Sequence, residues 1–72
     1  MSTRKPLLHI RYGGRSYDVP LQDLDMGPAS SDDQIRRAVA AYLEEPLSKL
    51  RLFVVERHDN GNMTIRPEAV FG

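Results

Sequence analysis

The sequence predicts a small α+β domain in which two β-hairpins flank a single helix. Three observations lead to this fold class: a Gly13-Gly14 pair near the start, an Asn60-Gly61 pair near the end, and one capped helix signal between them. Both dipeptides are typical of the tight turns that join antiparallel strands. The chain has 72 residues, which is enough for one hydrophobic core. We therefore interpret residues 1–72 as a single domain, with 1–6 and 68–72 as flexible tails.

Residues 7–21 have the pattern of a first hairpin. Apolar side chains recur at every second position on each side of the turn, at Leu8, Ile10, Tyr12, Tyr17, Val19 and Leu21. Alternation with a period of two indicates strands with one buried and one wet face. The glycine pair supplies the positive φ angles of a two-residue turn. Pro20 has no N–H for a ladder, so the second strand should be an edge strand or end there.

A helix is expected to start after Ser31, because Ser31 and Gln34 have the spacing of a capping box. Apolar residues then recur at helical spacing, at Ile35, Ala38, Val39, Tyr42 and Leu43. This spacing is typical of a helix with one apolar stripe. Pro46 should end the helix near Glu45.

A second hairpin is expected in the C-terminal third of the chain. Residues 50–58 are the most strand-like segment, and residues 63–66 form the return strand. The turn between them should be centred on Asn60-Gly61. Pro67 should end regular pairing or mark an edge of the sheet.

This order of elements resembles the ubiquitin-like β-grasp superfold, and the resemblance covers nearly the whole chain. It rests on the element order, ββαββ, and on the hydrophobic pattern described above. The resemblance implies a four-stranded mixed sheet with the helix packed on one face. We expect the strand order 2-1-4-3, with the first and fourth strands parallel. The order 2-1-3-4 stays open, because Pro67 and the apolar third strand both favour it.

One helix covers one face of such a sheet and leaves the other face open. Within residues 50–58 the arginines occupy alternate positions, so we expect that set to point outward. The open face would then have an apolar centre surrounded by guanidinium groups, formed by Arg11, Arg51, Phe53, Val55, Arg57 and Arg66. On this interpretation, Phe53→Lys would weaken partner binding and leave thermal stability almost unchanged.

Three hypotheses compete for this face. The first is protein binding, because apolar side chains among arginines are typical of interface hot spots; ubiquitin-like domains also commonly bind partners through such a face. The second is structural: Val70 and Phe71, or a second copy of the chain, cover Phe53 and Val55. A homodimer through an edge of the sheet is also open. The third is single-stranded nucleic acid, whose bases can stack on an exposed ring. One Phe on a neutral chain supports the third hypothesis least.

The last residue of the chain provides a further alternative. Modifiers and sulfur carriers of the ubiquitin-like superfold end in a Gly-Gly tail whose carboxylate is activated. That resemblance would make Gly72 a conjugation terminus. Phe71 stands where the second glycine should be, so an ordinary C-terminus is the simpler interpretation.

The composition narrows the remaining classes of function. The chain has no cysteine, which excludes disulfides and fits a cytoplasmic protein. Ten basic residues balance ten acidic ones, so bulk attraction to nucleic acid or to a membrane surface is not expected. No apolar run approaches the length of a membrane span. His9 and His58 are the only histidines, and nothing places them beside a nucleophile, so we predict a non-enzyme without metal or cofactor.

Overall fold

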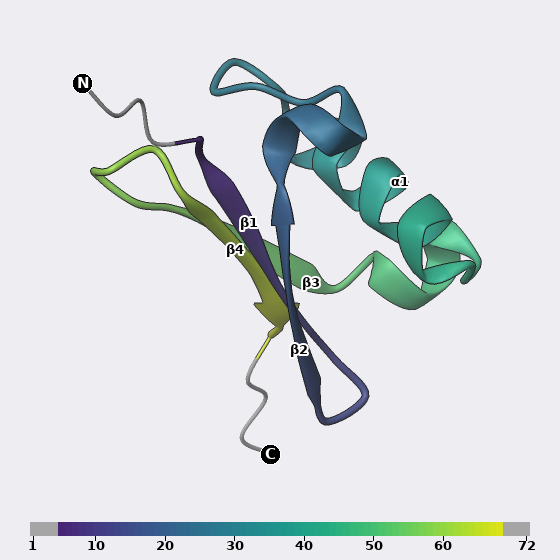
Figure 1. The fold of residues 1–72 in the computed structure, drawn as a ribbon. Helices are drawn as coiled ribbons and strands as arrows, with labels where there is room; N and C mark the ends of the chain where they lie inside the picture. Colours follow the sequence, from purple (N-terminus) through teal and green to yellow (C-terminus); the bar gives the residue numbers. More distant parts are fainter. Residues whose placement is uncertain (1–4, 69–72) are drawn as a thin grey trace.

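The structure is a computed structural model that describes residues 5–68 (Figure 1). These residues form four strands, one α-helix and two short 3₁₀ helices. In chain order the elements are β1 (Leu7–Tyr12), β2 (Arg15–Pro20), η1 (Leu21–Leu24), α1 (Asp32–Leu43), η2 (Leu47–Leu50), β3 (Phe53–Arg57) and β4 (Met63–Pro67). The predicted order of two hairpins around a helix is confirmed.

The expected flexible tails lie mainly outside the described residues. Only Lys5 and Pro6 of the first tail and Glu68 of the second are described. The Pro6 carbonyl accepts a hydrogen bond from the Leu21 N–H at 3.0 Å, which ties the chain ahead of β1 to the end of β2. The proposed cover by residues 70–71 also lies outside the described residues.

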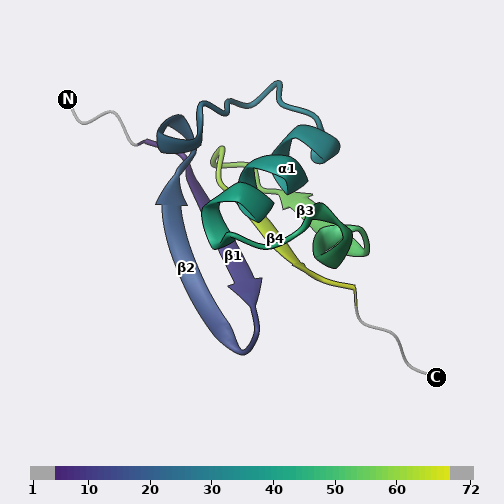
Figure 2. The same ribbon diagram turned by 90° about the vertical axis from the view of Figure 1, so that its right-hand side faces the viewer.

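The four strands form one mixed sheet in the order β2-β1-β4-β3, as predicted. β1 and β4 pair in parallel at the centre, and each of them pairs antiparallel with its outer neighbour. Figure 2 shows α1 crossing one face of this sheet. Within residues 5–68 no element covers the opposite face, which we call the open face.

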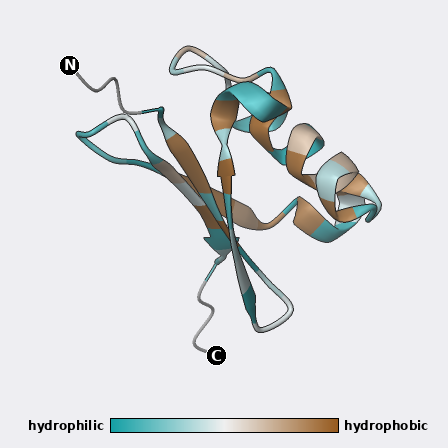
Figure 3. Cartoon of the chain, viewed as in Figure 1, coloured by the Kyte–Doolittle hydropathy of each residue, from teal (hydrophilic) through white to brown (hydrophobic). Residues whose placement is uncertain are grey.

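The core lies between the helix and the sheet. Inner strands, helix and 3₁₀ turns all contribute to it, and Figure 3 shows that apolar residues concentrate on these elements. Its buried side chains are Leu8, Ile10, Val19, Leu21, Ile35, Val39, Ala40, Leu50, Met63 and Ile65. Burial of each of the larger ones contributes about 1.5–3 kcal/mol, which makes this layer the main source of stability.

The first hairpin and the helix follow the sequence signals closely. Gly13 and Gly14 have φ angles of 60° and 78°, as a two-residue turn between Tyr12 and Arg15 requires. Pro20 is the last residue of β2, which is an edge strand. The helix begins at its predicted capping box, where the Ser31 hydroxyl accepts the backbone N–H at position 34.

The second hairpin differs from the prediction by one residue in its turn. The His58 N–H donates to the Asn62 carbonyl at 2.9 Å, and the Gly61 N–H donates to the His58 carbonyl at 3.0 Å. Between the paired residues 58 and 62 lies a three-residue loop, with Gly61 at a φ of 90°, rather than a two-residue turn centred on Asn60-Gly61. A type I turn followed by a glycine in the left-handed region gives this geometry.

The strand before that loop also starts later than expected. Leu50 is buried, but it belongs to the 3₁₀ helix η2, and Arg51 and Leu52 form a turn before β3 begins at Phe53. The expected strand from residue 50 is therefore wrong at its start. A buried residue on a helical turn carries no information about which face of the following strand is buried.

We expect Gly61→Ala to destabilise the fold by about 1–2 kcal/mol, because an L-residue is strained in the left-handed region. The added Cβ meets only Pro6, at 3.9 Å, so the cost is conformational rather than steric. Gly27→Ala is the matched control, since Gly27 lacks a positive φ and has open space around its Cβ. Urea unfolding measures both; equal stabilities of the two variants would contradict the loop geometry.

Candidate functional site

The pairing of β3 with β4 decides which side chains of β3 face the helix. Directly opposed residues of an antiparallel pair point to the same face of a sheet. Val55 is paired with Ile65, whose side chain is fully buried under the helix. Val55 and Phe53 therefore lie on the helix face, where both pack against the core. Their expected position on the open face is wrong.

Phe53 lies among residues at the end of the sheet. Its ring centroid is 5.9 Å from that of Tyr12, and its carbonyl accepts a hydrogen bond from Arg36 Nε at 3.0 Å. Burial raises the pKa of Tyr12, and a hydrogen bond and the negative charge of Glu45 raise it further. Phe53 thus belongs to the packed layer that joins β3 to the helix side.

Arg57 lies on the same face as Phe53 and Val55, because it is paired with the buried Met63. Its guanidinium donates to the Ser30 carbonyl at 3.0 Å and to the Asp32 carboxylate at 2.6 Å. Arg57 therefore links the end of β3 to the first turn of α1. The sequence predicts Arg57 on the open face because it is charged. That expectation is wrong, because the long side chain lets the guanidinium reach polar groups at the start of the helix.

The six residues predicted to form one binding face are divided among three places. Phe53, Val55 and Arg57 are on the helix face. Arg51 is exposed in the turn before β3. Only Arg11 and Arg66 lie on the open face, on neighbouring strands. The structure therefore does not assemble the predicted apolar centre.

The open face is instead polar. His9 Nδ1 lies 2.5 Å from the carboxylate of Asp18 on β2, and His58 Nε2 lies 2.8 Å from the hydroxyl of Thr64 on β4. Both histidines thus have neighbours in the sheet. Val54 is a half-buried apolar residue on this face, opposite Arg66. Such a face is suited to contact with water or with polar ligands rather than to a hydrophobic interface.

Glu56 and Arg66 form the clearest ion pair on the open face. Arg66 donates from Nε and from one terminal nitrogen to the two carboxylate oxygens of Glu56, each at 3.1 Å. The hydrogen bonds from Arg66, followed by its charge, hold the pKa of Glu56 below its ordinary value. The same contacts raise the pKa of Arg66. The charge of Arg66 is thereby largely compensated within the sheet.

The backbone of β3 has an exposed outer edge. Hydrogen-bonded pairs recur at every second residue from the 58–62 pair, so Val54 and Glu56 direct their backbone groups toward β4. Val55 and Arg57 direct theirs outward, where no other strand pairs within the described residues. This edge can therefore accept an additional strand.

Exposed apolar and cationic side chains lie on η2, on the turn that leads into β3 and on the part of α1 that packs against η2. Leu52 is 73% exposed and Leu47 is 41% exposed. A hollow of about 330 Å³ is lined there by Asp33, Arg36, Arg37, Leu47, Ser48 and Arg51, and Asp33 is bound to Arg36. The cationic residues of the hollow that remain are Arg37 and Arg51. Both arginines are exposed, and neither forms an ion pair within residues 5–68. We call Arg37, Leu47, Arg51 and Leu52, together with the outer edge of β3, the edge patch.

The sequence contained partial signals for the edge patch. Arg37 falls off the apolar stripe of the helix, which predicts exposure. The alternation within residues 50–58 predicts that Leu52 points inward, opposite to the arginines, and Leu47 falls in no expected element. In the structure, Leu47 on the 3₁₀ helix η2 and Leu52 on the turn after it are both exposed, whereas Leu50 is buried. This arrangement depends on packing that periodicity alone does not reveal.

No group of three or more metal-binding side chains occurs within the part of the chain that the structure describes. Across residues 5–68, no helix has the length and apolar character needed to cross a membrane. The alternative conjugation terminus, Gly72, lies outside the described residues.

No protein-family model, curated protein or solved structure matches this chain. Its function is therefore inferred from the surfaces described above.

We expect Phe53→Lys to destabilise the domain by about 1–3 kcal/mol, because a charge would replace a ring packed against the core. This reverses the expectation from the sequence. Leu52→Lys is the matched control, since Leu52 is 73% exposed and its replacement should change stability by less than about 0.5 kcal/mol. Thermal unfolding of both variants measures the difference, and an unchanged Phe53→Lys melting temperature would place the ring outside the core.

The lowered pKa of Glu56 predicts a pH dependence of stability. Its ionised form is favoured in the folded state, so the contribution is complete above the ordinary pKa of 4.5 and is lost as the pH falls through the lower folded value. Arg66→Gln should return the Glu56 pKa toward 4.5 and remove this part of the acid dependence. An NMR titration of the Glu56 carboxyl carbon measures it; an identical pKa in both proteins would exclude the ion pair as the cause.

Proposed function

We propose that the domain is a non-enzymatic protein-interaction module that binds an extended segment of a partner at the edge patch. The observation that carries this proposal is the outer edge of β3, whose unpaired backbone groups follow directly after the exposed Arg51 and Leu52. Strand addition to an exposed edge supplies affinity through main-chain hydrogen bonds and specificity through side chains next to the edge.

The composition of the edge patch indicates the chemistry of the partner. Leu47 and Leu52 offer apolar contacts, while Arg37 and Arg51 favour carboxylates. A matching segment is extended, carries apolar or β-branched residues at alternate positions, and has Asp or Glu beside them. Arginines surrounding apolar anchors are also typical of interface hot spots.

The two edges of the sheet, β2 and β3, differ in how well they can accept an added strand. On β2, the outward-directed positions include Pro20, which has no N–H to offer an added strand. On β3, Val55 and Arg57 keep both their N–H and their C=O groups, and Arg36 engages only the carbonyl of Phe53. The β3 edge therefore presents the more complete set of main-chain groups.

We also infer a relationship to the ubiquitin-like β-grasp superfold. Support comes from the ββαββ order and from the mixed sheet with its parallel central pair. Domains of that superfold commonly bind proteins, which agrees with the proposed function. The modifier alternative depends on Gly72, and the nucleic-acid alternative required an exposed Phe53; no observation on the described residues favours either.

A displayed library of random decapeptides tests the proposed function. Selected peptides should be enriched in Asp, Glu and β-branched residues, and a selected peptide should shift the amide NMR signals of β3 rather than those of β2. The double variant Arg51→Glu/Leu52→Asp should reduce binding at least about tenfold, because it removes an apolar contact and reverses a charge. Peptides that bind the variant equally well would contradict the proposal.

N-methylation of single backbone amides in a synthetic chain tests strand addition directly. The Val55 amide points outward and makes no bond within the sheet, so its methylation should abolish peptide binding while preserving the fold. The Asp18 amide is the matched control, because it points outward from the opposite edge. Equal peptide binding by the two methylated proteins would exclude the β3 edge.

A further inference from the structure

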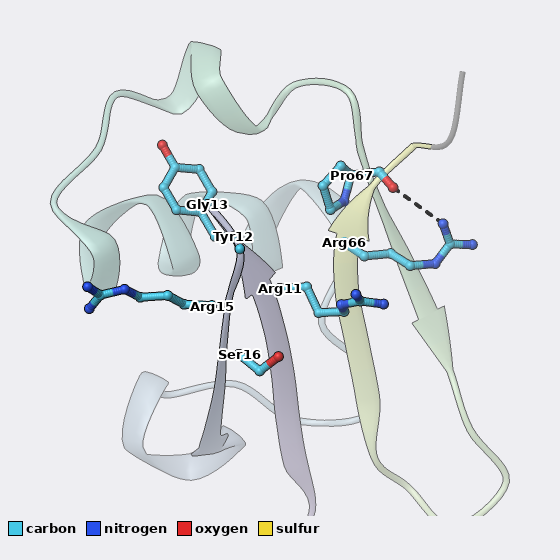
Figure 4. Close-up of a pocket in the computed structure, with 8 residues that line it drawn as sticks. Arg11, Tyr12, Gly13, Arg15, Ser16, Arg66 and Pro67 are labelled. Atoms are coloured by element: carbon cyan, nitrogen blue, oxygen red, sulfur yellow. Dashed lines mark hydrogen bonds between the residues drawn. The ribbon is translucent and has the colours of Figure 1, made fainter. Parts of the chain in front are cut away.

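A cavity of about 350 Å³ lies at the end of the sheet, where the β1–β2 turn meets the end of β4 (Figure 4). Arg11, Arg15 and Arg66 are among the residues that line it, and no Asp or Glu of residues 5–68 is among them. In Figure 4, Arg11 and Arg66 extend in the same direction over the open face, whereas Arg15 points away from them. The cavity therefore has a cationic side formed by Arg11 together with Arg66, whose guanidinium is already bound to Glu56.

The parallel pairing of the central strands brings these two arginines together. His9 is paired with Thr64, and Ile10 with Ile65, so Arg11 and Arg66 occupy the next position of each strand. Neighbouring strands are about 4.8 Å apart, and like charges at opposed positions destabilise a sheet. The bond of Arg66 to Glu56 relieves part of this repulsion, and an anion beside Arg11 would relieve the rest.

The two arginines differ in how far their charges are compensated. Arg66 is bound to both carboxylate oxygens of Glu56 and also donates to the Pro67 carbonyl at 3.3 Å. Arg11 is exposed and makes no ion pair or hydrogen bond through its side chain within residues 5–68. Ser16 is paired with Arg11 on β2, and its exposed hydroxyl lies in the same cavity. Arg11 and Ser16 together offer donors that the described chain does not use.

We propose that this cavity binds the phosphate group of a small phosphate monoester. A guanidinium presents several N–H donors in a planar fork that matches two phosphate oxygens, and Arg11 supplies this fork. Ser16 supplies a hydroxyl donor from the other strand, and Arg66 adds positive charge from β4. A dianionic phosphate uses this combination better than a carboxylate does, because its three terminal oxygens can meet donors from several directions.

Titration of the intact protein with inorganic phosphate, adenosine monophosphate or acetate, at constant ionic strength, tests the site. Amide signals of residues 11–16 and 66 should shift with phosphate and with the nucleotide, and much less with acetate. Equal affinities for the first two would show that phosphate alone is recognised; tighter nucleotide binding would show that the cavity also holds part of the ester group. Shifts confined to other residues, or none with either phosphate, would overturn the proposal.

Two pairs of variants separate this site from general charge attraction. Arg11→Gln should weaken phosphate binding about tenfold, as expected for loss of a charged hydrogen-bond donor, whereas Arg37→Gln should have no effect. Glu56→Gln should tighten binding, because it removes the carboxylate that competes for Arg66. Asp33→Asn is its matched control, because it also removes one negative charge from an arginine partner, but at Arg36. Equal effects within either pair would overturn the proposal.

Discussion

The register of β3 against β4 is the constraint on which the functional surfaces of this domain depend. The pairing of His58 with Asn62 leaves three residues in the connecting loop. A two-residue turn would shift the pairing by one position, and a shift of one residue exchanges the two faces of a strand. The observed register turns Phe53 and Val55 toward the core. The Asn62 side chain supports this register by accepting the Leu7 N–H at 2.9 Å, which ties the loop to β1.

That register also gives arginine a structural role on the helix face. Arg57 and Arg36 both connect β3 to α1, one through Ser30 and Asp32 and the other through the Phe53 carbonyl. The carboxylates of Asp32 and Asp33 therefore have two roles. They interact favourably with the positive end of the helix dipole, and they bind the guanidinium groups of Arg57 and Arg36. Exposed ion pairs contribute modestly to stability, so their main effect is to orient the edge strand relative to the helix.

The arginines of the described chain consequently fall into two groups. Arg36, Arg57 and Arg66 each bind a carboxylate and a backbone carbonyl. Arg11, Arg15, Arg37 and Arg51 are exposed and form no ion pair within residues 5–68. Both proposed sites use arginines of the second group, because an uncompensated guanidinium gains more from an added anion than a compensated one does. The phosphate site adds Arg66 from the first group. A neutral chain can in this way present local cationic surfaces.

The sequence by itself determined the fold class, the first hairpin and the helix start, because these depend on local signals. It left two strand orders open, and the parallel pairing of β1 with β4 decided between them. A glycine pair imposes its turn geometry, and the capping box at Ser31 satisfies backbone groups within four residues of the chain. Only the tertiary structure decided which face of β3 is buried. Leu50 is buried from a 3₁₀ helix, and the second loop holds one residue more than its dipeptide signal suggests. Each difference changes which of the alternating residues of β3 face the helix. Packing of β3 against α1 and β4 decides this, and the residues of the strand alone do not.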